Sequence, residues 1–109
     1  MLQGAIQMEF EWDEVKNSIN KQKHNIDFAD AVHVFIDSKR VYRKDSRKDK
    51  NYEEDRFQTI GLTKFGVLMV VYTFRDRNQV IRLISARKAN KREKKAYDLG
   101  FLKPFEEAI

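Results

Sequence analysis

The stretch RFQTIGLTKFGVLMVVYTFRDRNQVIRLISA, residues 56–86, decides the fold class, because it contains three strand-like segments separated by two short turns. Residues 67–74 are apolar at consecutive positions, which indicates a strand buried on both faces at the centre of a sheet. The loop 64–66 ends in glycine and suits a hairpin with a bulge, and residues 75–78 suit a second tight turn. The sequence therefore predicts an antiparallel meander with strands at 56–63, 67–74 and 79–86.

A strand and a helix are expected at the beginning of the chain. MEFEW, residues 8–12, alternates apolar and acidic residues, which is the period of a half-buried strand. Asp13 suits the N-cap of a helix over 14–24. That helix has only a thin apolar stripe, Val15 and Ile19, so we expect it to lie mostly exposed.

A second helix and a fourth strand of the meander follow. Asn25 suits the left-handed residue that ends the first helix, and Asp27 can cap a helix over 28–36. RVYR, residues 40–43, suits a short edge strand protected by the basic residues around it. The rest of the stretch up to residue 55 has the composition of an exposed loop.

The last element is predicted to be a helix that follows the third strand. Asn90 and Glu93 have the spacing of a capping box that opens a helix, and Gly100 suits its end. We expect its packing stripe to consist of Ala89, Ala96 and Leu99. The predicted fold class is α+β, a β-α-α unit followed by an antiparallel β-meander and a C-terminal helix.

The length of 109 residues and the mass of 13.0 kDa suit one compact domain, which we place at residues 8–100. Residues 1–7 are then an N-terminal extension, and residues 101–109 a tail that packs or stays loose. No apolar run approaches the roughly 20 residues that span a bilayer, and no signal peptide is recognisable. With no cysteine in the chain, we expect a cytoplasmic protein without a membrane partner.

Positive charge is concentrated in the second part of the chain. Residues 1–38 contain three Lys or Arg and seven Asp or Glu, whereas residues 39–109 contain nineteen and ten. The net charge of +5 is therefore the sum of an acidic and a strongly basic part. Such a skew favours a polyanionic partner such as nucleic acid, although many basic surfaces bind nothing.

Several chemistries are excluded by what the sequence lacks. The two histidines stand nine residues apart and no cysteine is present, which disfavours a zinc site. Neither a phosphate-binding glycine loop nor a G-x-S-x-G nucleophile elbow occurs. We therefore expect no metal and no cofactor.

A dense group of cations marks the junction between the third strand and the last helix. Residues 82–97 contain seven Lys or Arg and one acid. Arg87, Lys88, Lys91 and Arg92 should meet at the helix N-terminus, whose own positive potential adds to their repulsion. Either an anion normally binds there, or the cations form a solvated face with acids folded over it from elsewhere.

The directions of these side chains follow from the period of each element. In a regular strand Arg82 and Ile84 point to one face, and Leu83 and Ser85 to the other. The i, i+4 and i+7 spacing should gather further cations on one helical face, namely Lys88, Arg92 and Lys95.

Four segments together resemble a known family. They are FEWDEVKNSINKQKHNIDFADA (10–31), RFQTIGLT (56–63), LMVVYT (68–73) and IRLISARKANKREKKAY (81–97). In this order and spacing they resemble the BrnT toxins of bacterial type II toxin–antitoxin systems, and the resemblance extends from residue 8 to residue 97. Asn25 stands where the family usually has Gly, and Asn90 where it has Thr, and both keep the local capping role.

The resemblance implies a compact fold like that of the RelE-type toxins and an endoribonuclease activity that halts translation. It also implies a protein partner, a BrnA-type antitoxin with a ribbon-helix-helix DNA-binding part, so that operator DNA is contacted only through the antitoxin. A toxin–antitoxin heterotetramer is compatible with this reading.

The hypothesis for catalysis is metal-independent cleavage, in which the RNA 2′-OH attacks the adjacent phosphate. Arginine stabilises the charge that develops on phosphorus, because its planar fork holds two phosphate oxygens and stays protonated. We assign this role to Arg87 and Arg56, with Arg82 and Arg92 as supports. The competing interpretations are an ion pair of Arg56 with Glu53 or Glu54, and a buried structural ion pair at Arg82.

Proton transfer requires a group that titrates near neutrality, and His24 is the obvious candidate. Lys23 or Lys88 could replace it if the cluster lowers their pKa values, and His24 could instead only cap the end of its helix. The RNA-binding residues are predicted to be Lys23, Lys88, Lys91, Arg92 and Lys95.

Two other functions remain compatible with a basic face. A non-catalytic nucleic-acid-binding module would bind RNA in a salt-dependent manner and leave it intact. A protein-interaction module would dock an acidic partner and bind no nucleic acid at moderate salt.

Overall fold

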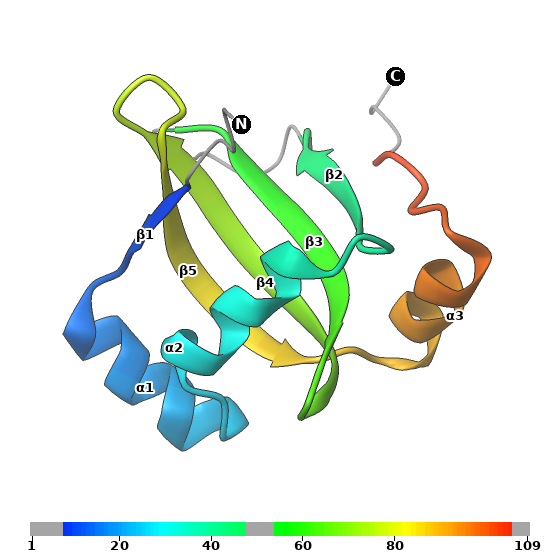
Figure 1. The fold of residues 1–109 in the computed structure, drawn as a ribbon, viewed down its shortest axis with the longest axis horizontal. Helices are drawn as coiled ribbons and strands as arrows, with labels where there is room; N and C mark the ends of the chain where they lie inside the picture. The colour runs from blue at the N-terminus through cyan, green and yellow to red at the C-terminus, as the bar shows by residue number, and fades with distance from the viewer. Residues whose placement is uncertain (1–7, 48–53, 106–109) are drawn as a thin grey trace, which may run out of the picture.

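A computed structural model of the chain describes residues 8–47 and 54–105 as an α+β fold in which helices pack on a curved, mixed sheet (Figure 1). The elements are β1 (Glu9–Glu11), α1 (Glu14–His24), α2 (Phe28–Ala31), the 3-10 helix η1 (Val32–Ile36), β2 (Val41–Asp45), β3 (Arg56–Thr63), β4 (Gly66–Arg75), β5 (Val80–Lys88) and α3 (Lys91–Leu99). None of the helices in these described ranges is long and apolar enough to cross a bilayer.

The sheet has the order β1-β5-β4-β3-β2. Strands β2 to β5 pair antiparallel in chain order, so the predicted meander is present and the apolar strand β4 lies at its centre. The RVYR segment forms the edge strand β2, as expected, and extends to Asp45, which is buried rather than part of an exposed loop. Residues 48–53 of the predicted loop lie outside the described residues. Strand β1 pairs parallel with β5 and makes the sheet mixed.

The helix boundaries follow the capping signals. The Asp13 side chain accepts hydrogen bonds from the backbone N–H groups of Val15 and Lys16, at 2.8 and 3.2 Å. Asn25 adopts the left-handed conformation at the end of α1, with φ 59°. The second helix has the predicted cap, Asp27, but is α-helical only to Ala31 and continues as η1.

Helix α1 lies mostly exposed, as predicted, but it does not pack through its apolar stripe. Val15 and Ile19 are 69% and 56% exposed, whereas Asn17 and Asn20 are buried. The Asn20 side chain donates to the backbone carbonyl of Ala86 and accepts from its N–H, at 2.9 and 3.1 Å. The helix therefore lies along the part of the β5 edge that short strand β1 does not cover, and an edge requires hydrogen-bond partners rather than apolar side chains.

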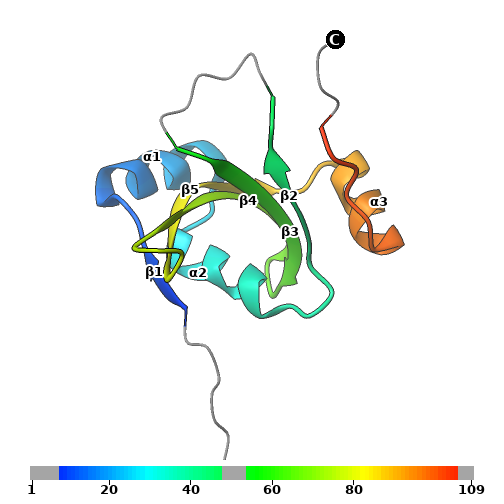
Figure 2. The same ribbon diagram turned by 90° about the horizontal axis from the view of Figure 1, so that it is seen from above.

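The helices lie on both faces of the sheet (Figures 1 and 2). Helix α2 and η1 cover one face over the main core, which contains Phe28, Val34, Leu68, Val70, Tyr72 and Leu83. Helix α3 packs on the other face, beside β2 and β3, over a smaller cluster of Val41, Ile60, Met69 and Ala89. The part of this second face that α3 leaves uncovered carries the polar residues considered below.

Helix α3 opens with the predicted capping box and ends at Gly100, with φ 75°. Its predicted stripe is wrong at Leu99, which is 71% exposed, because Tyr97 takes that place against the smaller cluster. The Tyr97 hydroxyl donates to Asp37 Oδ2 at 2.6 Å. Lys88 belongs to β5, which extends past its predicted end at residue 86, and not to the helix.

Candidate active site

One irregularity in β5 decides which of its arginines share a face. Strands β4 and β5 pair regularly except for one register shift near the middle, where β5 supplies an extra residue. Arg82 lies opposite Thr73, and Arg87 lies opposite Met69. Because Thr73 and Met69 are four residues apart on β4, Arg82 and Arg87 project from the same face of the sheet.

The predicted alternation along β5 is therefore wrong beyond Leu83. The extra residue is Ile84, so that Ser85, and not Ile84, shares a face with Arg82. Strict alternation would have turned Arg87 to the face that carries the main core. The bulge brings both arginines to the face on which α3 packs.

Two further arginines join them from β2 and β3. Arg43 lies opposite Gln58, and Arg56 lies next to Phe57 at the beginning of β3, opposite Asp45. Neighbouring strands are about 4.8 Å apart, so the backbones of β3 and β5 are separated by about 10 Å. We call the surface formed by Arg43, Arg56, Gln58, Arg82 and Arg87 the arginine face.

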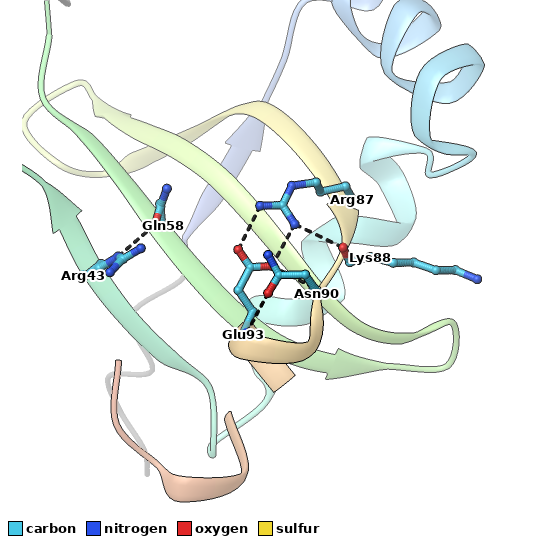
Figure 3. A network of polar contacts seen from close by, with 6 residues as sticks. All are labelled: Arg43, Gln58, Arg87, Lys88, Asn90 and Glu93. Carbon is cyan, nitrogen blue, oxygen red and sulfur yellow. Dashed lines mark hydrogen bonds and ion pairs between the residues drawn. The ribbon is translucent and has the colours of Figure 1, made fainter. Parts of the chain in front are cut away.

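Arg87 is held on this face by the carboxylate of Glu93 in α3 (Figure 3). Arg87 Nη1 and Nη2 donate to Glu93 Oε1 and Oε2 at 2.7 and 2.8 Å, and the Asn90 backbone N–H donates to Oε1 at 2.9 Å. The hydrogen bonds to Glu93 raise the pKa of Arg87 although burial opposes its charge. Burial disfavours the charged form of Glu93, but the hydrogen bonds from Arg87 and Asn90 outweigh it and lower the Glu93 pKa.

These contacts decide between the two interpretations of the cation cluster at Arg87. Glu93, an acid of the following helix, pairs with the guanidinium, so Arg87 already has an anionic partner within its own chain. The carboxylate nevertheless presents two oxygens to the fork of Arg87, which is also how a phosphate group binds arginine. The fork of Arg87 therefore has the geometry that binds an oxyanion, and in this structure the oxyanion is the carboxylate of Glu93.

Arg43 is the residue that sequence reasoning missed. Arg43 Nε donates to Gln58 Oε1 at 2.9 Å, and Arg43 Nη1 donates to the Lys103 carbonyl at 2.7 Å. Burial and the nearby charge of Arg47 lower the pKa of Arg43, and Glu93 counteracts this. Glu93 therefore lies within electrostatic reach of both Arg43 and Arg87. The only signal for Arg43 was its position in a basic edge strand, because the surrounding segment matched no family pattern.

Arg82 and Arg56 lie towards the other end of the face from Arg87. Arg82 Nη1 donates to Glu11 Oε2 at 2.6 Å, and both side chains are partly exposed, so the pair is not the buried one considered above. Of the two acids considered for Arg56, Glu54 pairs with Arg75 instead, and residue 53 lies outside the described ranges.

His24 lies at the end of α1, where that helix runs beside β5. It lines a hollow of about 190 Å³ together with Lys23, Ile84 and Ser85. Burial and the charges of Lys23 and Arg87 lower the pKa of His24 below its usual value of 6.5. The lowered pKa favours the neutral form of His24, which can accept a proton.

The predicted RNA-binding lysines do not gather around Arg87. Lys88 lies opposite Leu68, and its side chain points away from Glu93 (Figure 3). Lys91 and Lys95 are two residues before and after Glu93, which places them on the opposite side of α3. Arg92 is exposed in the first turn of α3, and Lys23 is exposed next to His24.

A hollow of about 520 Å³ lies elsewhere on the described part of the molecule. It is mainly apolar, is lined by Ile36, Leu62 and Phe65 among others, and contains none of the predicted site residues. Within residues 8–47 and 54–105, no three side chains of His, Cys, Asp or Glu gather as metal ligands would.

Comparison with known families identifies the family of the chain. Residues 12–93, which are 82 of the 109 residues, match the family described as "Ribonuclease toxin, BrnT, of type II toxin-antitoxin system". The match contains Arg43, Arg56, Arg82, Arg87 and Glu93. No curated protein matches the chain as a relative. The matched length shows that the chain belongs to the BrnT family of ribonuclease toxins of type II toxin–antitoxin systems.

Proposed function

We propose that this chain is an endoribonuclease that cleaves RNA without a metal ion, on the arginine face. The observation that carries the proposal is the convergence of four arginines on one sheet face. One of them, Arg87, donates two hydrogen bonds to the two oxygens of a carboxylate, which is the arrangement in which arginine also binds a phosphate group. Arginine clamps are well suited to a transition state in which negative charge grows on phosphorus.

The chemistry assigned to the site is attack of a 2′-OH on the adjacent phosphorus. Neutral His24 accepts the 2′-hydroxyl proton, the 2′ oxygen bonds to phosphorus, and the 5′ oxygen leaves and takes a proton from water. The products are a 2′,3′-cyclic phosphate and a free 5′-hydroxyl. Arg87 holds the phosphate beside His24, and Arg56 and Arg82 bind the chain further along the face.

Glu93 has a defined place in this scheme. To bind phosphate, Arg87 must exchange the carboxylate for the substrate, and both ligands offer two oxygens to the same fork. After the exchange Glu93 keeps its bond to the Asn90 N–H and remains near Arg43. Glu93 thus positions Arg87 in the free protein and leaves a counter-charge close to the site.

The partners and the cellular effect follow from the family and from the resemblance described above. We propose that a BrnA-type antitoxin neutralises the chain by covering the arginine face, and that the two proteins assemble as a heterotetramer that contacts operator DNA through the antitoxin. Cleavage of RNA by the free chain, in the manner of the RelE-type toxins, would then halt translation.

The test is incubation of the purified chain with total RNA in the presence of a chelator. Arg87→Lys keeps the charge but removes the fork, and should reduce the cleavage rate about 10²-fold, the range found when one charge-stabilising donor is lost. Arg77→Lys, in an exposed turn between β4 and β5, is the matched control and should cleave normally.

Two results would overturn the proposal. Cleavage that needs an added divalent metal would remove the metal-free mechanism, and equal rates for Arg87→Lys and Arg77→Lys would remove the arginine face from catalysis. Salt-dependent binding of RNA that stays intact would favour the non-catalytic binding module instead.

A further inference from the structure

The C-terminal tail places an aromatic ring on the arginine face. The Phe105 ring lies over the guanidinium of Arg43, with 3.6 Å between Arg43 Cζ and the ring centroid, and 4.7 Å from Arg47 Cζ. Phe105 lies beyond the residues that the family match covers. This contact is therefore a feature of this chain outside its matched region.

Both guanidinium groups already donate hydrogen bonds from part of their edges to groups of the protein. Arg43 donates to Gln58 and to the Lys103 carbonyl, and Arg47 donates through Nε and Nη2 to Asp45, at 2.7 and 2.6 Å. The Asp45 side chain is only 2% exposed, so this ion pair fixes Arg47 in place. Both residues therefore offer the flat face of the guanidinium, and a flat face binds planar rings rather than phosphate.

The two flat groups lie next to the proposed phosphate site. Glu93 acts electrostatically on Arg43 and is hydrogen-bonded to Arg87, so one carboxylate links the two positions. Single-stranded RNA is recognised largely by stacking of its bases on aromatic rings and guanidinium planes. A nucleotide whose phosphate is bound at Arg87 would thus carry its base towards Arg43.

We propose that Arg43 and Arg47 form a stacking subsite for one base of single-stranded RNA, and that Phe105 fills this subsite while RNA is absent. The proposal rests on the proposed function, because it assumes that RNA binds the arginine face. Phe105 lies where the base binds and must leave before the base can stack. The tail therefore competes with the substrate for the subsite but not for the phosphate site.

Binding of two matched oligonucleotides tests the subsite. The first is a short 2′-O-methyl RNA, which lacks the attacking hydroxyl, and the second has the same backbone with abasic residues. Phe105→Ala should tighten binding of the base-bearing oligomer about threefold to tenfold, as expected from loss of one competing ring–cation contact, and change the abasic oligomer less than about twofold. Leu102, which anchors the tail on the smaller cluster, is retained in this variant.

A second variant tests the same subsite from the other side. Arg43→Lys keeps the positive charge but removes the planar guanidinium group. It should therefore weaken binding of the base-bearing oligomer about threefold and leave binding of the abasic oligomer unchanged. The matched control is Arg40→Lys, because Arg40 also lies over two rings, 5.4 Å from Phe35 and 5.1 Å from Tyr42. It should not change the ratio of the two affinities.

The proposed subsite would be refuted if Phe105→Ala changed the binding affinity of both oligomers equally, or changed neither affinity. The first result would mean that the tail only screens charge, and the second that the ring only packs. Failure of the proposed cleavage is distinguishable, since RNA would then stay intact while the base-dependent difference in affinity persists.

Discussion

Replacing Glu93 with glutamine tests whether Arg87 is held ready for a phosphate group. Glutamine serves the N3 position of a capping box as well as glutamate does, so the bond to the Asn90 N–H is retained. The substitution removes the negative charge that holds the fork of Arg87 and replaces one of the two acceptor oxygens with an amide NH2 group, which cannot accept from Arg87. It should therefore weaken the fold and strengthen the binding of RNA at the same time.

The cost in stability follows from the two hydrogen bonds of 2.7 and 2.8 Å. Hydrogen bonds to charged groups contribute about 1.5–3 kcal/mol each, and solvent screening of Arg87, which is 34% exposed, reduces this. We expect Glu93→Gln to lower the free energy of unfolding by about 1–2 kcal/mol at pH 7, measured by urea denaturation.

The pH dependence of that difference has a defined sign. The pKa of Glu93 is lowered in the folded protein, so its stabilising effect is complete above the unfolded value of about 4.3 and is lost as the pH falls through the folded pKa. The stabilities of wild type and Glu93→Gln should therefore begin to converge as the pH falls below about 4.3, and the difference should disappear below the folded pKa of Glu93, because only the wild type loses a charge there.

Binding of RNA should change in the opposite direction. The wild type must break the Glu93 ion pair before Arg87 can bind phosphate, and avoiding about 1.4 kcal/mol of that cost corresponds to tenfold tighter binding. In the wild type the displaced Glu93 carboxylate takes up a cation when Arg87 binds phosphate, so Glu93→Gln should release about one more counterion on binding and steepen the slope of log K against log salt concentration by about 0.7, the value for single strands. Fluorescence anisotropy of a labelled 2′-O-methyl RNA over a range of salt concentrations measures both quantities.

The control has the same change in net charge. Asp98→Asn removes one negative charge from an exposed position near the other end of α3, away from the arginine face. If Glu93→Gln and Asp98→Asn give the same affinity and the same salt slope, Arg87 does not bind phosphate and the reasoning is refuted.

Three other substitutions test the fold and the proton transfer. Asn20→Ala removes three hydrogen bonds of a buried side chain and should destabilise the protein by about 2–3 kcal/mol in urea denaturation, whereas Ser18→Ala on the exposed side of α1 should stay within about 0.5 kcal/mol. Gly61→Ala would bring its Cβ to 2.8 Å from Val34 Cγ1 and should cost about 1–3 kcal/mol; an unchanged melting temperature would contradict that tight contact. His24→Gln should abolish an acidic limb of the pH–rate profile whose midpoint lies below 6.5 in the wild type, and a profile of unchanged shape would exclude His24 as the base.

The sequence predicted that the candidate site would be a cluster of basic residues, but it did not predict every residue of that cluster. The sequence pointed to Arg56, Arg82 and Arg87, and these lie on one face of the sheet. Arg43 was missed because its neighbours in the structure, Gln58 and the tail, are distant along the chain. The lysines of α3 were predicted from a helical spacing counted from Lys88, but Lys88 belongs to β5, and the geometry of α3 turns Lys91 and Lys95 to the side opposite Glu93.

The sequence by itself determined the elements and their ends. Asp13, Asn25, Asn90 and Gly100 each act within about four residues, and hydrophobic periodicity is a property of a continuous segment, so both can be read without tertiary information. The central position of β4 followed in the same way from its apolar residues on both faces.

Only the tertiary structure decided how these elements meet. The polar packing of α1 depends on an edge of β5 that is 66 residues away, and the face of Arg87 depends on one extra residue in the pairing of β5 with β4. The physical reason is that a one-residue change of register reverses the face of every following side chain, while leaving the local pattern of the strand unchanged. The convergence of arginines is therefore a property of strand pairing and not of any one segment.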